Sequence, residues 1–211
     1  MTDVILFNKP FNVLCQFTSI AGKQTLANYI KQPGFYAAGR LDQDSEGLIL
    51  LTNNGLLNAL ITQPKNKMWK TYLVQVEGQK SESACAQLRS GIVLKDGLTK
   101  PAFIRIIPPP VWLWDRTPPI RQRKNIADHW IEIKIAEGKN RQIRRMTAAV
   151  GLPTLRLIRT AIGPFELNGL PCNAHRQVAI PSQIELLLNT KQLIKNKKAN
   201  RYSYYQRNHN N

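Results

Sequence analysis

Residues 39–47 place three carboxylates and an arginine between two glycines. The acids Asp42, Asp44 and Glu46 stand at every second position, and Arg40 lies two residues before the first of them. A carboxylate beside an arginine stays ionised, which suits a nucleophile or a base rather than a general acid. Either these acids are solvated loop charges, or at least one of them, with Asp42 favoured by its arginine neighbour, is positioned for catalysis.

A second group of charged residues occupies 137–146, where the sequence predicts the start of a helix. The cations of this segment are Lys139, Arg141, Arg144 and Arg145. Cations in the first turn oppose the helix macrodipole, at a cost of up to ~1 kcal/mol each, so we expect an anion to lie there. That anion is either RNA phosphate or Asp42. The alternative is a phosphate-binding helix with no catalytic residue.

The elements that must position these groups are mostly strands. Alternating or continuous apolar runs predict strands at 48–52, 70–76, 130–135 and 155–162. A serine cap predicts a helix at 81–88 that ends at Gly91, and a second helix is expected within 140–151. The sequence shows no internal repeat. We therefore expect a mixed α/β or α+β domain built on one extended sheet.

The overall charge is strongly positive. The 211 residues hold 30 Lys and Arg against 13 Asp and Glu, which gives a net charge of +17. This indicates a nucleic-acid partner, with an acidic membrane surface as the competing interpretation. The apolar runs fall far short of the ~20 residues that span a bilayer, so we expect no membrane protein. Three widely spaced cysteines indicate the reducing cytoplasm, and scattered Cys and His residues predict no metal site.

Two segments outside the predicted sheet could contact RNA. Residues 108–124 are rich in proline, which predicts a projecting loop that displays aromatic and cationic side chains. The candidates there are Trp112, Trp114, Arg121 and Arg123. We expect the cations to contact substrate and at least one tryptophan to pack on the core. Residues 190–211 form a basic tail, expected to be disordered, with six cations and no acid. This tail either binds RNA or only aids solubility.

Four motifs in order carry a resemblance to a known family. They are Asn8-Lys9-Pro10-Phe11-Asn12-Val13-Leu14, Gly39-Arg40-Leu41-Asp42 with Gly47-Leu48, Lys70-Thr71-Tyr72, and Gly138-Lys139-Asn140-Arg141-Gln142-Ile143-Arg144-Arg145-Met146. Over residues 4–188 the chain resembles the ribosomal pseudouridine synthases of the RsuA and RluB/E/F type, and segment 108–124 is similar to that of the RluE branch, which modifies large-subunit rRNA. The resemblance implies an α+β pseudouridine synthase fold, with a mixed, mostly antiparallel sheet in two halves, a central cleft and flanking helices.

The resemblance also implies roles for individual residues. Asp42 corresponds to the family's essential aspartate, which acts on the ribose to detach uracil, while Asp44 and Glu46 would be helpers at most. Tyr72 matches the tyrosine that packs against the flipped uracil and accepts the proton from C5, and Arg144 matches the basic residue paired with the aspartate. Arg40 would fill the space that the base leaves. The RNA-binding set would be Arg40, Lys9, Lys70, Lys139, Asn140, Arg141, Arg145, Arg121 and Arg123.

On these grounds we expect an isomerase that converts a specific uridine of large-subunit (23S) ribosomal RNA to pseudouridine by base flipping, with no metal and no cofactor. Residues 1–189 would form the catalytic domain, without the small S4-type RNA-binding domain of many relatives, and 190–211 the tail. We expect a cytoplasmic monomer whose partner is 23S rRNA or a pre-ribosomal large-subunit particle. Two alternatives are a non-catalytic rRNA-binding or ribosome assembly factor, and a metal-dependent nuclease that uses three acids on one face of an extended segment.

Overall fold

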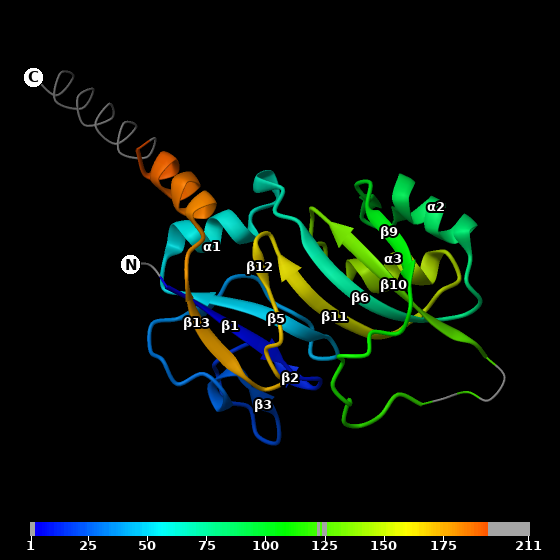
Figure 1. Cartoon of the computed structure of the whole chain (residues 1–211), viewed down its shortest axis with the longest axis horizontal. Helices are drawn as coiled ribbons and strands as arrows, with labels where there is room; N and C mark the ends of the chain where they lie inside the picture. The colour runs from blue at the N-terminus through cyan, green and yellow to red at the C-terminus, as the bar shows by residue number, and fades with distance from the viewer. Residues whose placement is uncertain (1–2, 122, 124–125, 194–211) are drawn as a thin grey trace, which may run out of the picture.

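A computed structural model describes residues 3–121, 123 and 126–193 (Figure 1). Their main feature is one mixed sheet that runs through the molecule. In spatial order its strands are β13 (His175–Ala179), β1 (Asp3–Lys9), β5 (Glu46–Thr52), β11 (Thr154–Ile162), β6 (Lys70–Glu77), β10 (Asp128–Ile135) and β9 (Phe103–Ile107). The short β4 (Tyr36–Ala37) pairs with β5, and β12 (Phe165–Glu166) pairs with β11.

Smaller elements surround this sheet. Two further strand pairs are β2 (Val13–Leu14) with β3 (Gln24–Thr25), and β7 (Val93–Leu94) with β8 (Gly97–Leu98). The helices are α1 (Gly55–Thr62), α2 (Glu82–Ser90), α3 (Gln142–Ala149), the 3-10 turns η1 (Leu26–Asn28) and η2 (Pro64–Asn66), and a helix over 182–193. No helix in this described part of the chain is long and apolar enough to cross a membrane.

The sheet consists of two antiparallel halves that meet at one parallel pair. β13, β1 and β5 form one half, and β11, β6, β10 and β9 form the other. β5 and β11 run parallel at the junction, where Gly47 faces Arg159. A Cβ atom on Gly47, whose φ is +99°, would lie 2.3 Å from the Arg159 carbonyl oxygen, so only glycine permits this approach. The expected α+β fold with a mixed sheet in two halves is confirmed.

Helices cover both faces of the sheet, because alternate residues of the central strands are apolar on each side. Ile49 and Leu51 of β5 join the core cluster that includes α2 and α3, whereas Leu48 and Leu50 join the one that includes α1 and helix 182–193. All four side chains are fully buried. Each contributes roughly 1.5–3 kcal/mol to folding, so the strand that follows the acidic loop is held rigidly from both sides.

The helix boundaries largely follow the predicted signals. Ser81 accepts a hydrogen bond from the Ala84 amide, and α2 ends at Gly91 with a positive φ of 103°. α3 begins after Arg141, which adopts the left-handed conformation. At the other end of the chain, residues 190–193 continue a helix, although we assigned them to the tail. The rest of the predicted tail, 194–211, lies outside the described residues.

Candidate active site

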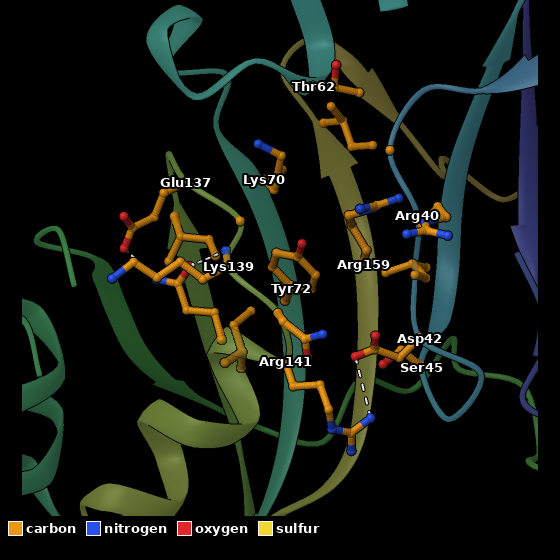
Figure 2. A pocket seen from close by; sticks show the side chains of 18 of the residues that line it. Arg40, Asp42, Ser45, Thr62, Lys70, Tyr72, Glu137, Lys139, Arg141 and Arg159 are labelled. Atoms are coloured by element: carbon orange, nitrogen blue, oxygen red, sulfur yellow. Dashed lines mark hydrogen bonds and ion pairs between the residues drawn. The ribbon is translucent and has the colours of Figure 1, made fainter. Parts of the chain in front are cut away.

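A cleft of about 410 Å³ opens on the sheet beside the junction of its two halves (Figure 2). This volume lies within the range of small-ligand sites, about 300–1,000 Å³. Loop 38–45, strands β6 and β11, and the segment before α3 form its walls. The cleft brings together seven of the predicted site residues, namely Arg40, Asp42, Lys70, Tyr72, Lys139, Asn140 and Arg141. Segments far apart in sequence therefore converge on one site.

Asp42 lies in a tight turn at one wall of the cleft. The Ser45 amide donates to the Asp42 carbonyl oxygen at 3.1 Å, so this stretch is not the extended segment that the nuclease hypothesis requires. The Asp42 side chain is 39% exposed, and its Oδ2 lies 3.6 Å from Nη1 of Arg141. The predicted neighbour, Arg40, also lines the cleft but forms no ion pair with Asp42 in the described structure. The carboxylate is thus open to a ligand and faces a cation from the α3 side.

Tyr72 forms part of the opposite wall. It is 7% exposed and lies on β6, in register with Arg159 of β11 and Ile133 of β10. Figure 2 shows its ring facing the loop that carries Asp42 across the cleft. An apolar ring on one wall and a carboxylate on the other form a slot suited to a flat base whose ribose reaches the acid.

Asp44, rather than Asp42, is the main carboxylate partner of Arg141 and Arg144 at the start of α3. Arg141 donates two hydrogen bonds to the Asp44 carboxylate, at 3.0 and 2.7 Å. Arg144 donates to the Asp44 carbonyl oxygen at 2.7 Å, and its Nε lies 3.4 Å from Asp44 Oδ2. Burial raises the pKa of Asp44, but the hydrogen bond from Arg141 and the charges of both arginines outweigh it and hold that pKa below its usual value.

This contact pattern corrects one expectation. Arg144 was expected to pair with Asp42, yet within the described structure its carboxylate partner is Asp44, and it does not line the cleft. The reason is the turn at 42–45, which directs the two acids differently. Arg141, one helical turn earlier, is the arginine that reaches both carboxylates.

A sequence profile of RNA pseudouridylate synthases matches residues 3–149, which include the Asp42 turn, Tyr72 and the cations of α3. The chain belongs to this RNA pseudouridylate synthase family. It is 52% identical over 179 residues to the ribosomal large subunit pseudouridine synthase E of Vibrio vulnificus, covering 85% of this chain and 76% of the relative. It is 53% identical over 169 residues to the protein of that name from Xanthomonas axonopodis pv. citri, covering 79% and 89%.

The fold agrees with this family. A crystal structure described as a pseudouridylate synthase superposes with a TM-score of 0.71 at 29% identity, covering 88% of this chain and 73% of that one. The chain is accordingly an isomerase. The chemistry of such an enzyme is internal to the nucleotide, because the bond between uracil N1 and ribose C1′ breaks and a bond between C5 and C1′ forms, with no net gain or loss of atoms.

Lys9, which we expected to contact RNA, lies in the protein interior in this structure. Its side chain is fully buried, and its ammonium donates to the carbonyl oxygens of Pro10, Val13 and, at 3.4 Å, Gln43. Burial lowers the pKa of Lys9 to about 8. The Asn12 amide donates to the same Gln43 oxygen at 2.9 Å. In this pseudouridine synthase, the first family motif therefore holds the loop that carries Asp42.

The remaining predicted cations have other neighbours. Arg145 donates to the Asp96 carboxylate at 2.7 and 3.0 Å, and Lys139 donates to the Asp96 carbonyl oxygen at 3.0 Å, so both hold the β7–β8 hairpin. Arg121 and Arg123 lie outside the cleft, in a separate hollow of about 660 Å³, where Arg123 pairs with Glu77 at 3.1 Å. Contacts of these four with RNA stay predictions.

Glu46 has a structural role. It is 1% exposed and accepts two hydrogen bonds from Arg156, at 2.8 and 2.9 Å, and one from the Trp114 indole at 2.8 Å. This confirms that one tryptophan of segment 108–124 packs on the core. It also contradicts the nuclease hypothesis, since Glu46 points to Arg156 while Asp44 is bound to Arg141. No set of three His, Cys, Asp or Glu side chains within the described residues could hold a metal ion.

One residue of the cleft was missed as an individual candidate. Arg159 lies on β11, lines the cleft and is 3% exposed. The sequence carried a signal, because an arginine interrupts the apolar run 155–162 just before its Gly163-Pro164 end. From the sequence alone, Arg159 belongs to a basic surface expected over residues 141–159. The sequence does not show that this arginine is buried.

Proposed function

We propose that the protein isomerises one uridine of 23S ribosomal RNA to pseudouridine, with Asp42 as the catalytic carboxylate. The observation that carries this proposal is the cleft itself, in which a partly exposed Asp42 faces the buried ring of Tyr72 across a slot bordered by cations. The names of the relatives from Vibrio and Xanthomonas support the large ribosomal subunit as the source of the substrate. The net charge of +17 supports RNA as the partner.

The proposed roles of the residues rest on the family resemblance, and their places in the cleft support them. The target uridine is flipped into the cleft, and Arg40 takes the space that the base leaves in the RNA. Asp42 acts on the ribose while the bond from C1′ to N1 breaks. The uracil turns and bonds to C1′ through C5, and the C5 proton passes by way of Tyr72 to solvent as N1 gains one. Arg141 and Arg144, fixed by Asp44, hold the wall against which this occurs.

The proposed RNA contacts, substrate and oligomeric state extend this assignment. Lys70, Lys139, Asn140 and Arg141 border the cleft and would contact the flipped nucleotide or its neighbours. The substrate is 23S rRNA, either free or in a pre-ribosomal large-subunit particle. We propose that the protein acts as a monomer in the cytoplasm.

The test is to map pseudouridine on large-subunit rRNA by carbodiimide modification and primer extension. Naked rRNA and precursor particles are each incubated with wild-type protein, with Asp42→Asn, and with Glu185→Gln, an exposed acid far along the chain that serves as the charge-matched control. We expect one new stop with wild type and control and none with Asp42→Asn.

Two results would change this proposal. A stop on precursor particles alone would keep the reaction and identify the particle as substrate. The absence of a new stop with wild-type protein on either RNA would favour the rRNA-binding or assembly factor, for which Asp42→Asn would retain full function.

A further inference from the structure

Arg159 is a buried arginine whose hydrogen-bonding capacity is mostly unused. Its Nε donates to the Leu48 carbonyl oxygen at 2.8 Å. Its Nη2 is buried and has no hydrogen-bond partner in the described part of the chain. A guanidinium carries five N–H groups, and leaving them unpaired away from water is unfavourable. An acceptor that enters from outside would satisfy this side chain.

The sheet places Arg159 on the floor of the catalytic cleft. It is in register with Tyr72 of β6 on one side and with Gly47 of β5 on the other. Figure 2 shows it between Tyr72 and the loop that carries Arg40 and Asp42. The parallel contact at Gly47 fixes its backbone, so the side chain is presented from a rigid strand rather than from a loop.

The charge around Arg159 is unbalanced. Lys70 also lines the cleft, and its pKa is lowered by burial and then by the charge of Arg159. Within the described structure neither side chain forms an ion pair with a carboxylate, whereas Arg141, Arg145 and Arg156 each do. Two neighbouring, partly desolvated cations without a counter-ion favour an anionic ligand.

We propose that Arg159, with Lys70 beside it, binds an anionic oxygen of the target nucleotide. This proposal rests on the proposed function, because the nucleotide in the cleft is the target uridine. Two oxygens have the required chemistry. One belongs to a phosphate that flanks the uridine, and the other is a uracil carbonyl oxygen, which gains negative charge while the bond from C1′ to N1 breaks. The family profile matches residues 3–149, so the match to the profile does not include Arg159.

Two variants test the contact, and a third is the control. Arg159→Met removes the charge, Arg159→Lys keeps it without the fork of donors, and Arg176→Met alters an exposed arginine on β13. Loss of a charge-assisted hydrogen bond made during the reaction predicts single-turnover rates lower by about 100-fold for Arg159→Met and about 10-fold for Arg159→Lys. RNA affinity should fall less, by about 3- to 10-fold, because the contact is already present in the bound RNA and strengthens during the reaction. The control should match wild type.

Modified RNAs then separate the contact from a structural role. A methylphosphonate on either side of the uridine removes one phosphate charge, and 2-thio- or 4-thiouridine weakens one carbonyl acceptor. If Arg159 binds a phosphate, one methylphosphonate slows wild type but not Arg159→Met. If it binds the base, one thiouridine does so. If every modification slows both proteins equally, the proposal is wrong and Arg159 only holds β5 through Leu48.

The same series is measured as RNA affinity in an Asp42→Asn background. Wild-type turnover of the unmodified RNA reports on the proposed function, whereas loss of the methylphosphonate or thiouridine effect on affinity in Arg159→Met reports on the contact. The two failures are therefore distinguishable. Melting temperatures of all variants accompany these measurements, because Arg159→Met also removes the hydrogen bond to Leu48.

Discussion

Lys9 places an ammonium group in the protein interior, directly under the loop that carries Asp42. Its folded-state pKa of about 8 lies below the ordinary value of 10.5. Between these two pH values the unfolded chain binds more protons than the folded one, so the free energy of unfolding rises with pH. We expect this gain to be about 1–3 kcal/mol from pH 7.5 to pH 10.5, an upper bound set by the pKa difference.

Urea denaturation at several pH values checks this prediction. Because other groups titrate in the same window, wild type is compared with Lys9→Met, which has no proton to lose. The free energy of unfolding of wild type should rise relative to Lys9→Met as pH increases. An unchanged difference would mean that Lys9 titrates normally.

Asp44 fixes two arginines, and its loss should weaken catalysis without abolishing it. In Asp44→Asn the side chain no longer carries the charge that pairs with Arg141 and Arg144. We expect turnover to fall by about 10-fold, since two cations near the cleft lose their orientation. Asp42→Asn, measured beside it in the same single-turnover assay, should show no turnover. Equal rates for both variants would contradict this division of roles.

The pH dependence of Asp44 has a definite sign. Its folded-state pKa lies below the ordinary value, so its contribution to stability is present above about pH 4 and is lost as pH falls further. The side chain is 37% exposed, so screening limits the contribution to about 1 kcal/mol or less. The difference in unfolding free energy between wild type and Asp44→Asn should therefore shrink from pH 7 to pH 3.

At the scale of single residues, sequence reasoning found residues of the cleft but not all of their partners. The spacing of residues 39–47 marked Asp42, although its expected neighbour Arg40 does not pair with it, and the alternation around Tyr72 predicted the strand on which it lies. It failed where partners are distant in sequence. Nothing in the pattern shows that Lys9 is buried or that Arg144 meets Asp44 instead of Asp42, because a turn of four residues decides the latter.

Trp114 links three elements of the fold. Its indole donates to Glu46 at the start of β5, and its carbonyl oxygen accepts from Arg156 of β11 at 3.0 Å. Trp114→Phe keeps an aromatic ring but leaves a buried carboxylate without one donor, which should lower the free energy of unfolding by about 1–3 kcal/mol. Trp112→Phe is the matched control, since Trp112 is 56% exposed, and should change it by less than about 0.5 kcal/mol.

Chemical denaturation of both variants measures this difference. A loss in Trp112→Phe as large as in Trp114→Phe would show that the segment packs as a unit rather than through Trp114. Proteolysis provides a second measurement, because a released loop 108–121 should be cleaved faster in Trp114→Phe than in wild type.

At the scale of elements, alternation and capping residues predicted β6, β10, β11 and α2, because these signals are local. The parallel pairing of β5 with β11 was not predicted. It joins residues more than one hundred positions apart, and only the glycine at position 47 hints that a backbone approaches closely. Our predicted domain boundary at residue 190 falls inside the helix over 182–193. The boundary was placed where the composition changes, and the helix continues past that point.

For the whole molecule, the sequence shows that the positive charge is divided between the catalytic domain and the basic tail. Of the net +17, six positive charges fall in residues 190–211, and the remaining +11 belongs to residues 1–189. Residue 191 lies in the described helix, and its ammonium donates to Asn66 Oδ1 at 2.6 Å. A truncation that keeps this hydrogen bond should therefore end after residue 193.

Truncation after residue 193 removes five cations, Lys195, Lys197, Lys198, Arg201 and Arg207. If they contact RNA phosphates, the slope of log Kd against log salt should fall by up to about 4, since each phosphate contact contributes about 0.7–0.9. A full-length chain with these five residues changed to glutamine controls for chain length and should show the same slope as the truncated one. An unchanged slope in both chains would leave RNA binding to the cations around the cleft and in segment 108–121. A change in the truncated chain alone would assign the effect to the tyrosines or the length of the tail rather than to its charge.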